Sequence, residues 1–305
     1  DAIYQNLNLI NDEQPDVVCV FGADHIYRMD PRQMVEQHIA SGAGVTVAAI
    51  PVGYEEAKSF GVIEAGPDNQ IIAFHEKSPT PPPMPGDATR CLASMGNYVF
   101  DTKTLIDIVT PAGTDDQHTD IGGHIIPALT EQGVAKLYDF SKNEVPGQDD
   151  REKGYWRDVG TLDSYYDANM DLLSPVPVFN LYNDKWPVFT SHQPLPPAKI
   201  SRGAGGEPSY VDGSLLCAGS IVSGAHVERS IASPGVRVHH DAHVTDSILF
   251  PGVVVGPGAR INRCILDKNV VVPPGARIGF DAAADAARFT ISDHGIVVIP
   301  KDFEF

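Results

Sequence analysis

The sequence predicts a two-domain protein, an α/β domain followed by a parallel β-helix. Short β-branched runs alternate with amphipathic helical patterns from residue 1 to about residue 173, which is typical of α/β folds. A repeat with a period of 17 residues covers residues 210–280. Between them lies a proline-rich stretch, so we expect a domain at 1–173, a semi-rigid connector at 174–200 and a second domain at 201–305.

The first domain shows its elements through turn residues and apolar stripes. Val17–Phe21 is short, apolar and β-branched, as expected of a buried parallel strand. Asp30 caps a helix that has Pro31 in its first turn and Gly42 as its stop. Repeated β-then-α units predict a mostly parallel sheet with helices on both faces. Further strands are expected at 45–52, 71–75, 94–100 and 134–140, and further helices at 1–13, 103–109, 121–132 and 161–172.

The repeat in the second domain identifies its architecture. Val227, Val244, Ile261 and Ile278 are each 17 residues apart. One coil of a three-sided parallel β-helix needs about this length, and it stacks each side chain on its equivalent roughly 4.8 Å along the axis. The same spacing relates Ile221, Val238, Val255 and Val272; Ile231, Ile248 and Ile265; Ala225, Ala242, Ala259 and Ala276; and Gly224, Asp241, Gly258 and Gly275.

Composition excludes several classes of function. The chain has 305 residues, of which 40 are acidic and 22 are basic, and its net charge is −18. Such a surface repels phosphate backbones, so we expect no nucleic-acid partner, although a bound divalent metal still permits a nucleotide substrate. The longest apolar runs are about five residues, far short of a membrane span. No Cys-x-x-Cys pair occurs, so the cysteines are expected to be reduced in a cytoplasmic protein: Cys19, Cys91, Cys217 and Cys264.

Two carboxylates stand where a parallel sheet would bind a ligand. Asp24 follows the first strand, and Asp158 precedes the start of a helix. Together they could hold one Mg²⁺ between the oxygens of a triphosphate. Each also has a local alternative, because Asp24 could cap a turn and Asp158 could cap the helix or pair with Arg157.

Two further segments could contact a sugar phosphate. Glu76 and Lys77 end a strand before a proline-rich loop, and a lysine held there can offer a point charge to a phosphate. Ser94 and Gly96 stand at an expected strand start, where a small hydroxyl and a glycine permit close approach of a sugar. The alternatives are an exposed ion pair and an ordinary strand.

Taken together, several segments resemble the glucose-1-phosphate adenylyltransferases of bacterial glycogen synthesis, and the resemblance runs over essentially the whole chain. No single segment is specific, but their order and spacing fit as a set. They are FGADHIYRMD at 21–30, SFGVIE at 59–64, FHEKSPTPPP at 74–83, ASMGNYVF at 93–100, YWRDVGTLDSYYDANMDLL at 155–173 and NLYNDKW at 180–186.

The resemblance implies a nucleotide-sugar-transferase domain with a Rossmann-like mixed sheet, followed by a left-handed β-helix. It implies a Mg²⁺-dependent, allosterically regulated homotetramer that converts ATP and α-D-glucose 1-phosphate into ADP-glucose and pyrophosphate. The family's glycine-rich triphosphate loop has no counterpart here, so roughly the first hundred residues of the pattern are expected to be missing and this chain alone to be inactive. The alternatives are another nucleotide or sugar phosphate as substrate, a non-catalytic regulatory subunit, or a β-helix acyltransferase.

The resemblance also implies roles for the individual residues that match the family's motifs. Asp24 and Asp158 are similar to the metal ligands, and Lys77 to the residue that grips the phosphate of glucose 1-phosphate. These three are the expected catalytic residues. Further substrate contacts are expected at Gly61, Glu76, Ser94, Gly96, Asp120 and Trp156.

Overall fold

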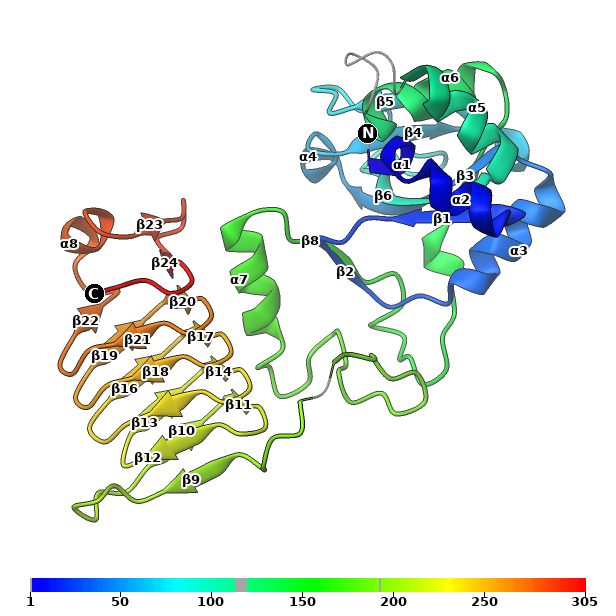
Figure 1. The fold of residues 1–305 in the computed structure, drawn as a ribbon. Coiled ribbons are helices and arrows are strands. Elements are labelled where there is room, and N and C mark those ends of the chain that lie inside the picture. The colour runs from blue at the N-terminus through cyan, green and yellow to red at the C-terminus, as the bar shows by residue number, and fades with distance from the viewer. Residues whose placement is uncertain (1, 113–119, 192) are drawn as a thin grey trace. The chain divides into compact units, whose positions relative to one another are not determined.

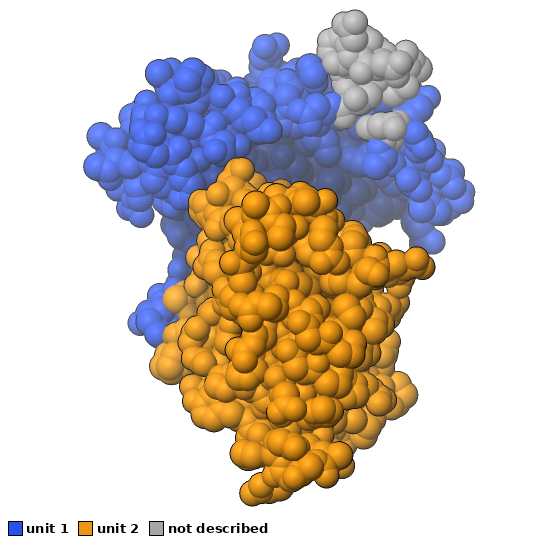
Figure 2. Space-filling model, turned by 90° about the vertical axis from the view of Figure 1, so that its left-hand side faces the viewer, with its two compact units in different colours: residues 1–156 blue, residues 157–305 orange. Residues whose placement is uncertain are grey.

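A computed structural model describes residues 2–112, 120–191 and 193–305. Contacts divide the chain into two compact units, Asp1–Trp156 and Arg157–Phe305 (Figure 2). The division passes through strand β8 (Trp156–Asp158), so the expected connector and second domain both fall in the second unit. Asp1, the first residue of the expected N-terminal helix, lies outside the described residues.

The first unit is built on a mixed sheet (Figure 1). Its strand order is β5-β4-β6-β3-β7, and β1 also pairs with β6. Only β3 and β7 run parallel, whereas β6 runs antiparallel to β1, β3 and β4. The expectation of a mostly parallel sheet was therefore wrong, because apolar runs mark a strand as buried without fixing its direction. The bounds are β1 Val17–Phe21, β3 Val45–Gly53, β4 Gly61–Ala65, β5 Ile71–Glu76, β6 Arg90–Asp101 and β7 Ala135–Asp139.

Helices cover both faces of this sheet, as the sequence predicts. One apolar cluster joins the sheet to α5 and α6 through Leu105 and Ile126, and another joins it to α3 through Met34. The Asp30 side chain accepts a hydrogen bond from the Arg32 amide and caps α3, which ends at Gly42 with φ 62°. The helices are α1 Ala2–Gln5, α2 Leu7–Glu13, α3 Pro31–Ser41, α4 Tyr54–Ala57, α5 Thr102–Ala112 and α6 Ile126–Glu131, with short turns at Pro67–Asn69, Ile121–Ile125 and Phe140–Lys142.

Strand β1 is neither parallel nor fully buried. It pairs antiparallel with β6, from Val17 opposite Asp101 to Phe21 opposite Asn97. Cys19 and Phe21 are exposed, although the sequence predicts a buried strand. β-branched residues occur in edge strands as well as in central ones, so the composition of this segment could not show which position β1 takes in the sheet.

Strand β6 carries a bulge next to the end of β1. Its pairing with β3 shifts between Val47 and Ala49, and Gly96 adopts φ 70°. The strand begins at Arg90, so Ser94 and Gly96 lie within it and not at its start, which corrects the prediction. The Gly22 amide donates to the Gly96 carbonyl at 3.2 Å. A glycine inside a strand pattern is a signal of such a bulge.

The second unit contains the predicted three-sided parallel β-helix (Figure 1). Val227, Val244 and Ile261 stack in register on successive coils, which confirms the 17-residue period. The predicted column is wrong at Ile221, because Val238 pairs with Val222, which is one residue closer than the 17-residue period requires. The strands are β9 Lys199–Ser201, β10 Tyr210–Asp212, β11 Leu215–Leu216, β12 Ile221–Ser223, β13 His226–Glu228, β14 Ile231–Ala232, β15 Arg237–Val238, β16 His243–Thr245, β17 Ile248–Leu249, β18 Val254–Val255, β19 Arg260–Asn262, β20 Cys264–Leu266, β21 Val271–Val272 and β22 Arg277–Ile278.

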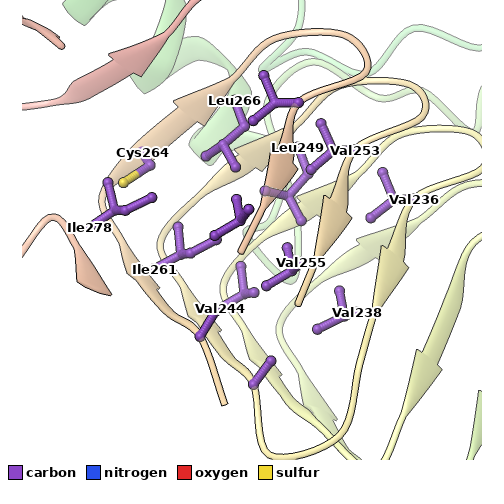
Figure 3. Packing of buried hydrophobic residues seen from close by; sticks show 14 of the residues in the cluster. Val236, Val238, Val244, Leu249, Val253, Val255, Ile261, Cys264, Leu266 and Ile278 are labelled. Carbon is purple, nitrogen blue, oxygen red and sulfur yellow. The ribbon is translucent and has the colours of Figure 1, made fainter. Parts of the chain in front are cut away.

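The inward side chains of the coils form one continuous apolar core (Figure 3). Valine, leucine and isoleucine from the three sheets meet there, and Cys264 fills one corner with its buried thiol. At the turn position, Gly224, Asp241, Gly258 and Gly275 all have positive φ. The predicted glycine and aspartate column therefore marks the left-handed residue of each corner. Helix α8 (Ala282–Ala286) and strands β23 (Thr290–Ile291) and β24 (Val297–Ile299) follow the last coil.

Helix α7 (Leu162–Asp171) packs on the β-helix. Thr161 and Ser164 form a capping box at its start, which confirms the predicted cap. Tyr166 is buried against Ile248 and Ile265, and its hydroxyl donates to the Asp246 carbonyl at 2.7 Å. Because of this packing, α7 belongs to the second unit.

Replacing Gly279 with alanine should destabilise the β-helix strongly. Gly279 has φ 83°, and an added Cβ would overlap the carbonyl oxygen of Asn262. The strained φ and the overlap each cost about 1–3 kcal/mol. Gly275→Ala is the matched control, because its φ of 70° is similar and nothing lies within 4 Å of the added atom. Urea unfolding should show a clearly larger loss for Gly279→Ala, and equal losses would contradict the argument.

Within the described residues, no helix combines the length and the apolar character needed to cross a bilayer. The four cysteines are all free thiols, in agreement with the sequence analysis.

Candidate functional site

Two short strands carry the predicted carboxylates toward each other. Strand β2 (His25–Tyr27) pairs with β8 (Trp156–Asp158), so Asp24 directly precedes one strand and Asp158 ends the other. Ligand atoms of Asp24, His25 and Asp158 all lie within 4.8 Å of one another. Asp158 belongs to β8, the strand that begins at Trp156 and pairs with β2. Two carboxylates at this separation suit a hard divalent cation, which prefers oxygen ligands.

Asp158 neither caps helix α7 nor pairs with Arg157, which were the two local alternatives. Thr161 caps α7, and Arg157 pairs with Asp171 at 2.7 Å. One oxygen of Asp158 accepts a hydrogen bond from the Gly160 amide at 2.8 Å. That bond fixes the carboxylate and leaves its other oxygen available to a ligand.

His25 joins this cluster, although the sequence analysis did not single it out. Its side chain is only 14% exposed, and its ring lies 5.0 Å from the Trp156 ring. A Cβ at Gly96 would lie 3.0 Å from the His25 ring, and one at Gly22 would lie 3.1 Å from it. The local signal was present in the Gly-Ala-Asp-His string, but the surrounding contacts come from segments far away in the chain.

A second group of predicted residues gathers at the β4–β5 hairpin. Gly61 stands opposite Glu76, and an added Cβ there would lie 2.9 Å from a Glu76 carboxylate oxygen. Gly122 approaches the same carboxylate, at 3.1 Å from its own virtual Cβ. Burial raises the pKa of Glu76, Lys77 lowers it and Asp120 raises it further. Glycines thus surround one face of a partly desolvated carboxylate, where a bulky side chain would not fit.

Asp120 and Tyr98 belong to the same group. The Asp120 side chain accepts a hydrogen bond from the Gly123 amide at 2.7 Å and so caps the turn Ile121–Ile125. Burial raises the pKa of Tyr98, and the charges of Glu76 and Asp120 raise it further. Three oxygen-bearing side chains therefore lie near one another, as a polyhydroxyl ligand requires.

Lys77 is exposed, and its ammonium forms no salt bridge with any described residue. The expected alternative, an ion pair with Glu76, is therefore not formed. Its amide donates to the Phe60 carbonyl at 3.0 Å, and its φ is 46°. The Phe60 ring lies 5.2 Å from the Trp156 ring. Ring contacts thus link the hairpin that bears Lys77 to the strand that bears His25.

Ser94 and Gly96 are placed differently from one another. Ser94 is 9% exposed, and Gly96 gives room to the His25 ring.

Trp156 packs between His25 and Phe60, and its indole nitrogen is buried with no hydrogen-bond partner among the described residues. The sequence-predicted residues therefore form a carboxylate pair with Trp156 beside it, and a Glu76 group that also holds Gly61 and Asp120. Their roles in catalysis and binding remain predictions.

Comparisons with known proteins identify relatives over the whole chain. The nucleotidyl transferase family profile matches residues 1–175, and the profile described as GlmU-like, C-terminal hexapeptide matches residues 196–299. The second match agrees with the predicted left-handed β-helix. The first assigns α7 to the transferase region, whereas contacts assign α7 to the second unit.

Curated relatives that carry the name glucose-1-phosphate adenylyltransferase align with almost the whole chain. The protein of Mycolicibacterium gilvum is 55% identical over 302 residues, that of Acidothermus cellulolyticus 54% over 310 and that of Corynebacterium jeikeium 51% over 304. Each alignment covers 99% of this chain and 74% of the relative.

Proposed function

Because the chain belongs to the glucose-1-phosphate adenylyltransferase family, a group of nucleotidyl transferases, we propose that its site joins ATP and α-D-glucose 1-phosphate into ADP-glucose and pyrophosphate. The observation that carries the proposal is the approach of Asp24 to Asp158 on strands β2 and β8. Pyrophosphate release by the full-length gene product, measured with each of the common nucleoside triphosphates, tests it. A strong preference for a triphosphate other than ATP would overturn it.

The reaction needs positioning more than acid or base chemistry. An anionic phosphate oxygen of glucose 1-phosphate attacks the α-phosphorus of ATP in line. The new O–Pα bond forms as the bond from Pα to the bridging oxygen breaks, and pyrophosphate leaves with the electron pair. No proton must be removed from the nucleophile, so catalysis rests on orientation and on charge neutralisation.

The carboxylate pair fits a divalent cation such as Mg²⁺. Asp24 and Asp158 would hold it, and a bound cation neutralises phosphate charge and orients the triphosphate. The Gly160 amide keeps one oxygen of Asp158 in place, which preserves the direction of its other oxygen. The donor set therefore suits the ion that the reaction requires.

The Glu76 group would receive the sugar phosphate. Lys77 offers the phosphate an ammonium that pairs with no described residue, and Glu76 accepts hydrogen bonds from the sugar hydroxyls. Gly61 lets the ring approach closely, because any side chain there would occupy the space beside Glu76. Ser94, Gly96, Asp120 and Trp156 are proposed as further substrate contacts.

Lys77→Ala should raise the KM for glucose 1-phosphate with a smaller effect on kcat. Removing one charge-assisted contact to a phosphate costs about 1.5–3 kcal/mol, which corresponds to roughly a 10- to 100-fold weaker interaction. Steady-state kinetics of the full-length gene product measure both constants. Lys103→Ala, which removes an exposed lysine that pairs with Asp107 on α5, is the control. An unchanged KM for the Lys77 variant would contradict the assignment.

In the same proposal the enzyme is a cytoplasmic homotetramer. Its support is the resemblance to the family, whose nucleotide and sugar-phosphate substrates are metabolites of the cytoplasm. Sedimentation equilibrium of the full-length gene product tests the assembly, and a monomer at micromolar concentration would contradict it.

A further inference from the structure

The imidazole of His25 is the least explained polar group of the site. Its Nε2 lies 3.5 Å from Oδ1 of Asp24, whereas its Nδ1 is buried and has no hydrogen-bond partner among the described residues. The Trp156 ring covers it at 5.0 Å. A Cβ added at Gly22 or Gly96 would come close to its Cε1 and Nδ1 atoms, so both glycines leave room for the ring. The ring is therefore held in one orientation by packing.

The contact of Nε2 with Asp24 indicates which nitrogen carries the proton of the neutral ring. Nδ1 is buried without a partner among the described residues in either tautomer, whereas a lone pair on Nε2 would face the negative charge of Asp24. A proton on Nε2 instead points toward the Asp24 carboxylate at 3.5 Å. The neutral ring accordingly favours the Nε2–H tautomer. A small rotation of the carboxylate then gives a charge-assisted hydrogen bond.

We propose that His25 is a positioning residue, which holds Oδ1 of Asp24 through its Nε2–H and so fixes the carboxylate that would bind the divalent cation. This inference rests on the proposed function, because it assumes that Asp24 is a metal ligand. A protonated Nε2 has no lone pair for a metal, and Nδ1 is buried, so His25 acts through Asp24 and is not itself a ligand. Metal sites commonly depend on such outer hydrogen bonds, whose loss weakens binding about 10- to 100-fold.

The glycines explain how the ring reaches this position. Gly96 lies in the β6 bulge with φ 70°, and a side chain there would meet the His25 ring. Gly22 leaves the same space on the side of β1. The bulge thus makes room for an imidazole directly beside the carboxylate that it orients, which is a common use of bulges next to active sites.

Binding of Mn²⁺ to the full-length gene product, followed by electron paramagnetic resonance, tests the inference without turnover. His25→Phe retains an aromatic ring without the donor, and should weaken Mn²⁺ binding about 10-fold. His25→Gln can present an amide N–H at a similar reach, and should bind within about twofold of the original chain. His75→Gln, which replaces an exposed histidine beside Glu64, is the matched control and should change nothing.

The outcomes separate the inference from the function on which it rests. Equal Mn²⁺ affinity for the original chain and Asp24→Asn would mean that the proposed metal site is wrong. Loss in Asp24→Asn with no loss in His25→Phe would overturn the role of His25 alone. Loss in both His25 variants, larger for Co²⁺ than for Mn²⁺, would also overturn it, because this pattern indicates direct ligation by the imidazole.

Discussion

Asp24→Asn is expected to lower kcat about 100- to 1,000-fold in the full-length gene product, with a smaller change in the KM for glucose 1-phosphate. Asparagine keeps the size of the side chain and removes the charge that would hold the divalent cation. Loss of one preorganised group that stabilises charge in the transition state costs about 3–4 kcal/mol. Steady-state kinetics and Mn²⁺ binding to the same variant measure the two consequences separately.

Asp158→Asn should behave in the same way, and the double variant should be little worse than either single one. Two groups that hold the same ion act as a unit, so their effects are not additive. Asp12→Asn is the control, because that residue is exposed on α2 and is not a member of the cluster. If the two single losses multiplied in the double variant, the aspartates would not share one ligand.

The β-helix was predictable almost residue by residue because each coil contacts only its neighbours. A side chain that must stack on its equivalent one coil away leaves a period in the sequence, and Val244 and Ile261 stack as that period requires. The error at Ile221 has a local cause, since the step from β12 to β15 is one residue shorter than the step from β15 to β18. Such a deviation at the end of a repeat carries no periodic signal.

The direction of the strands in the first unit could not be read in the same way. Strand β6 pairs with β1, β3 and β4, which come from separate parts of the chain. Alternation and apolar runs report which side of a strand is buried, but they do not report which neighbour it takes. The edge position of β1 and the bulge at Gly96 are therefore properties of the assembled sheet.

The same distinction, between local signals and contacts made only on folding, applies to the residues of the candidate site. Asp24 and Asp158 could be proposed because each follows or precedes an element end, where ligands bind in α/β proteins. His25 could not, since its significance depends on Gly22, Gly96 and Trp156, which surround it only after folding. The contact between Arg28 and Glu152 is a further case, because these residues are 124 positions apart.

Arg28 and Glu152 form a buried ion pair close to the two strands of the carboxylate site. Nε of Arg28 donates to Oε1 of Glu152 at 2.9 Å, and both side chains are 2% exposed. Arg28 directly follows β2, and Glu152 lies shortly before β8 in the chain. The pair therefore anchors the backbone on which Asp24 and His25 are presented.

Glu152→Gln should destabilise the first unit by about 1.5–3 kcal/mol, because it removes the charge that accepts the hydrogen bond of the buried Arg28 guanidinium. The matched control is Glu55→Gln, since Glu55 is 83% exposed in its pair with Lys58 and solvent screens that interaction. Urea unfolding followed by the fluorescence of Trp156, the tryptophan of the first unit, with Trp186→Phe as the common background, measures the loss. Equal midpoints for the Glu152 and Glu55 variants would contradict it.

The double variant Arg28→Met, Glu152→Leu separates the two costs that a single substitution combines. Removing one partner exposes the desolvation penalty of the other, whereas removing both removes that penalty as well. We therefore expect the double variant to be more stable than Glu152→Gln, even though it lacks the ion pair. Its Mn²⁺ affinity should then report whether the charges also orient β2: unchanged affinity would assign the pair to stability alone, and weakened affinity in a stable protein would assign it to the geometry of Asp24.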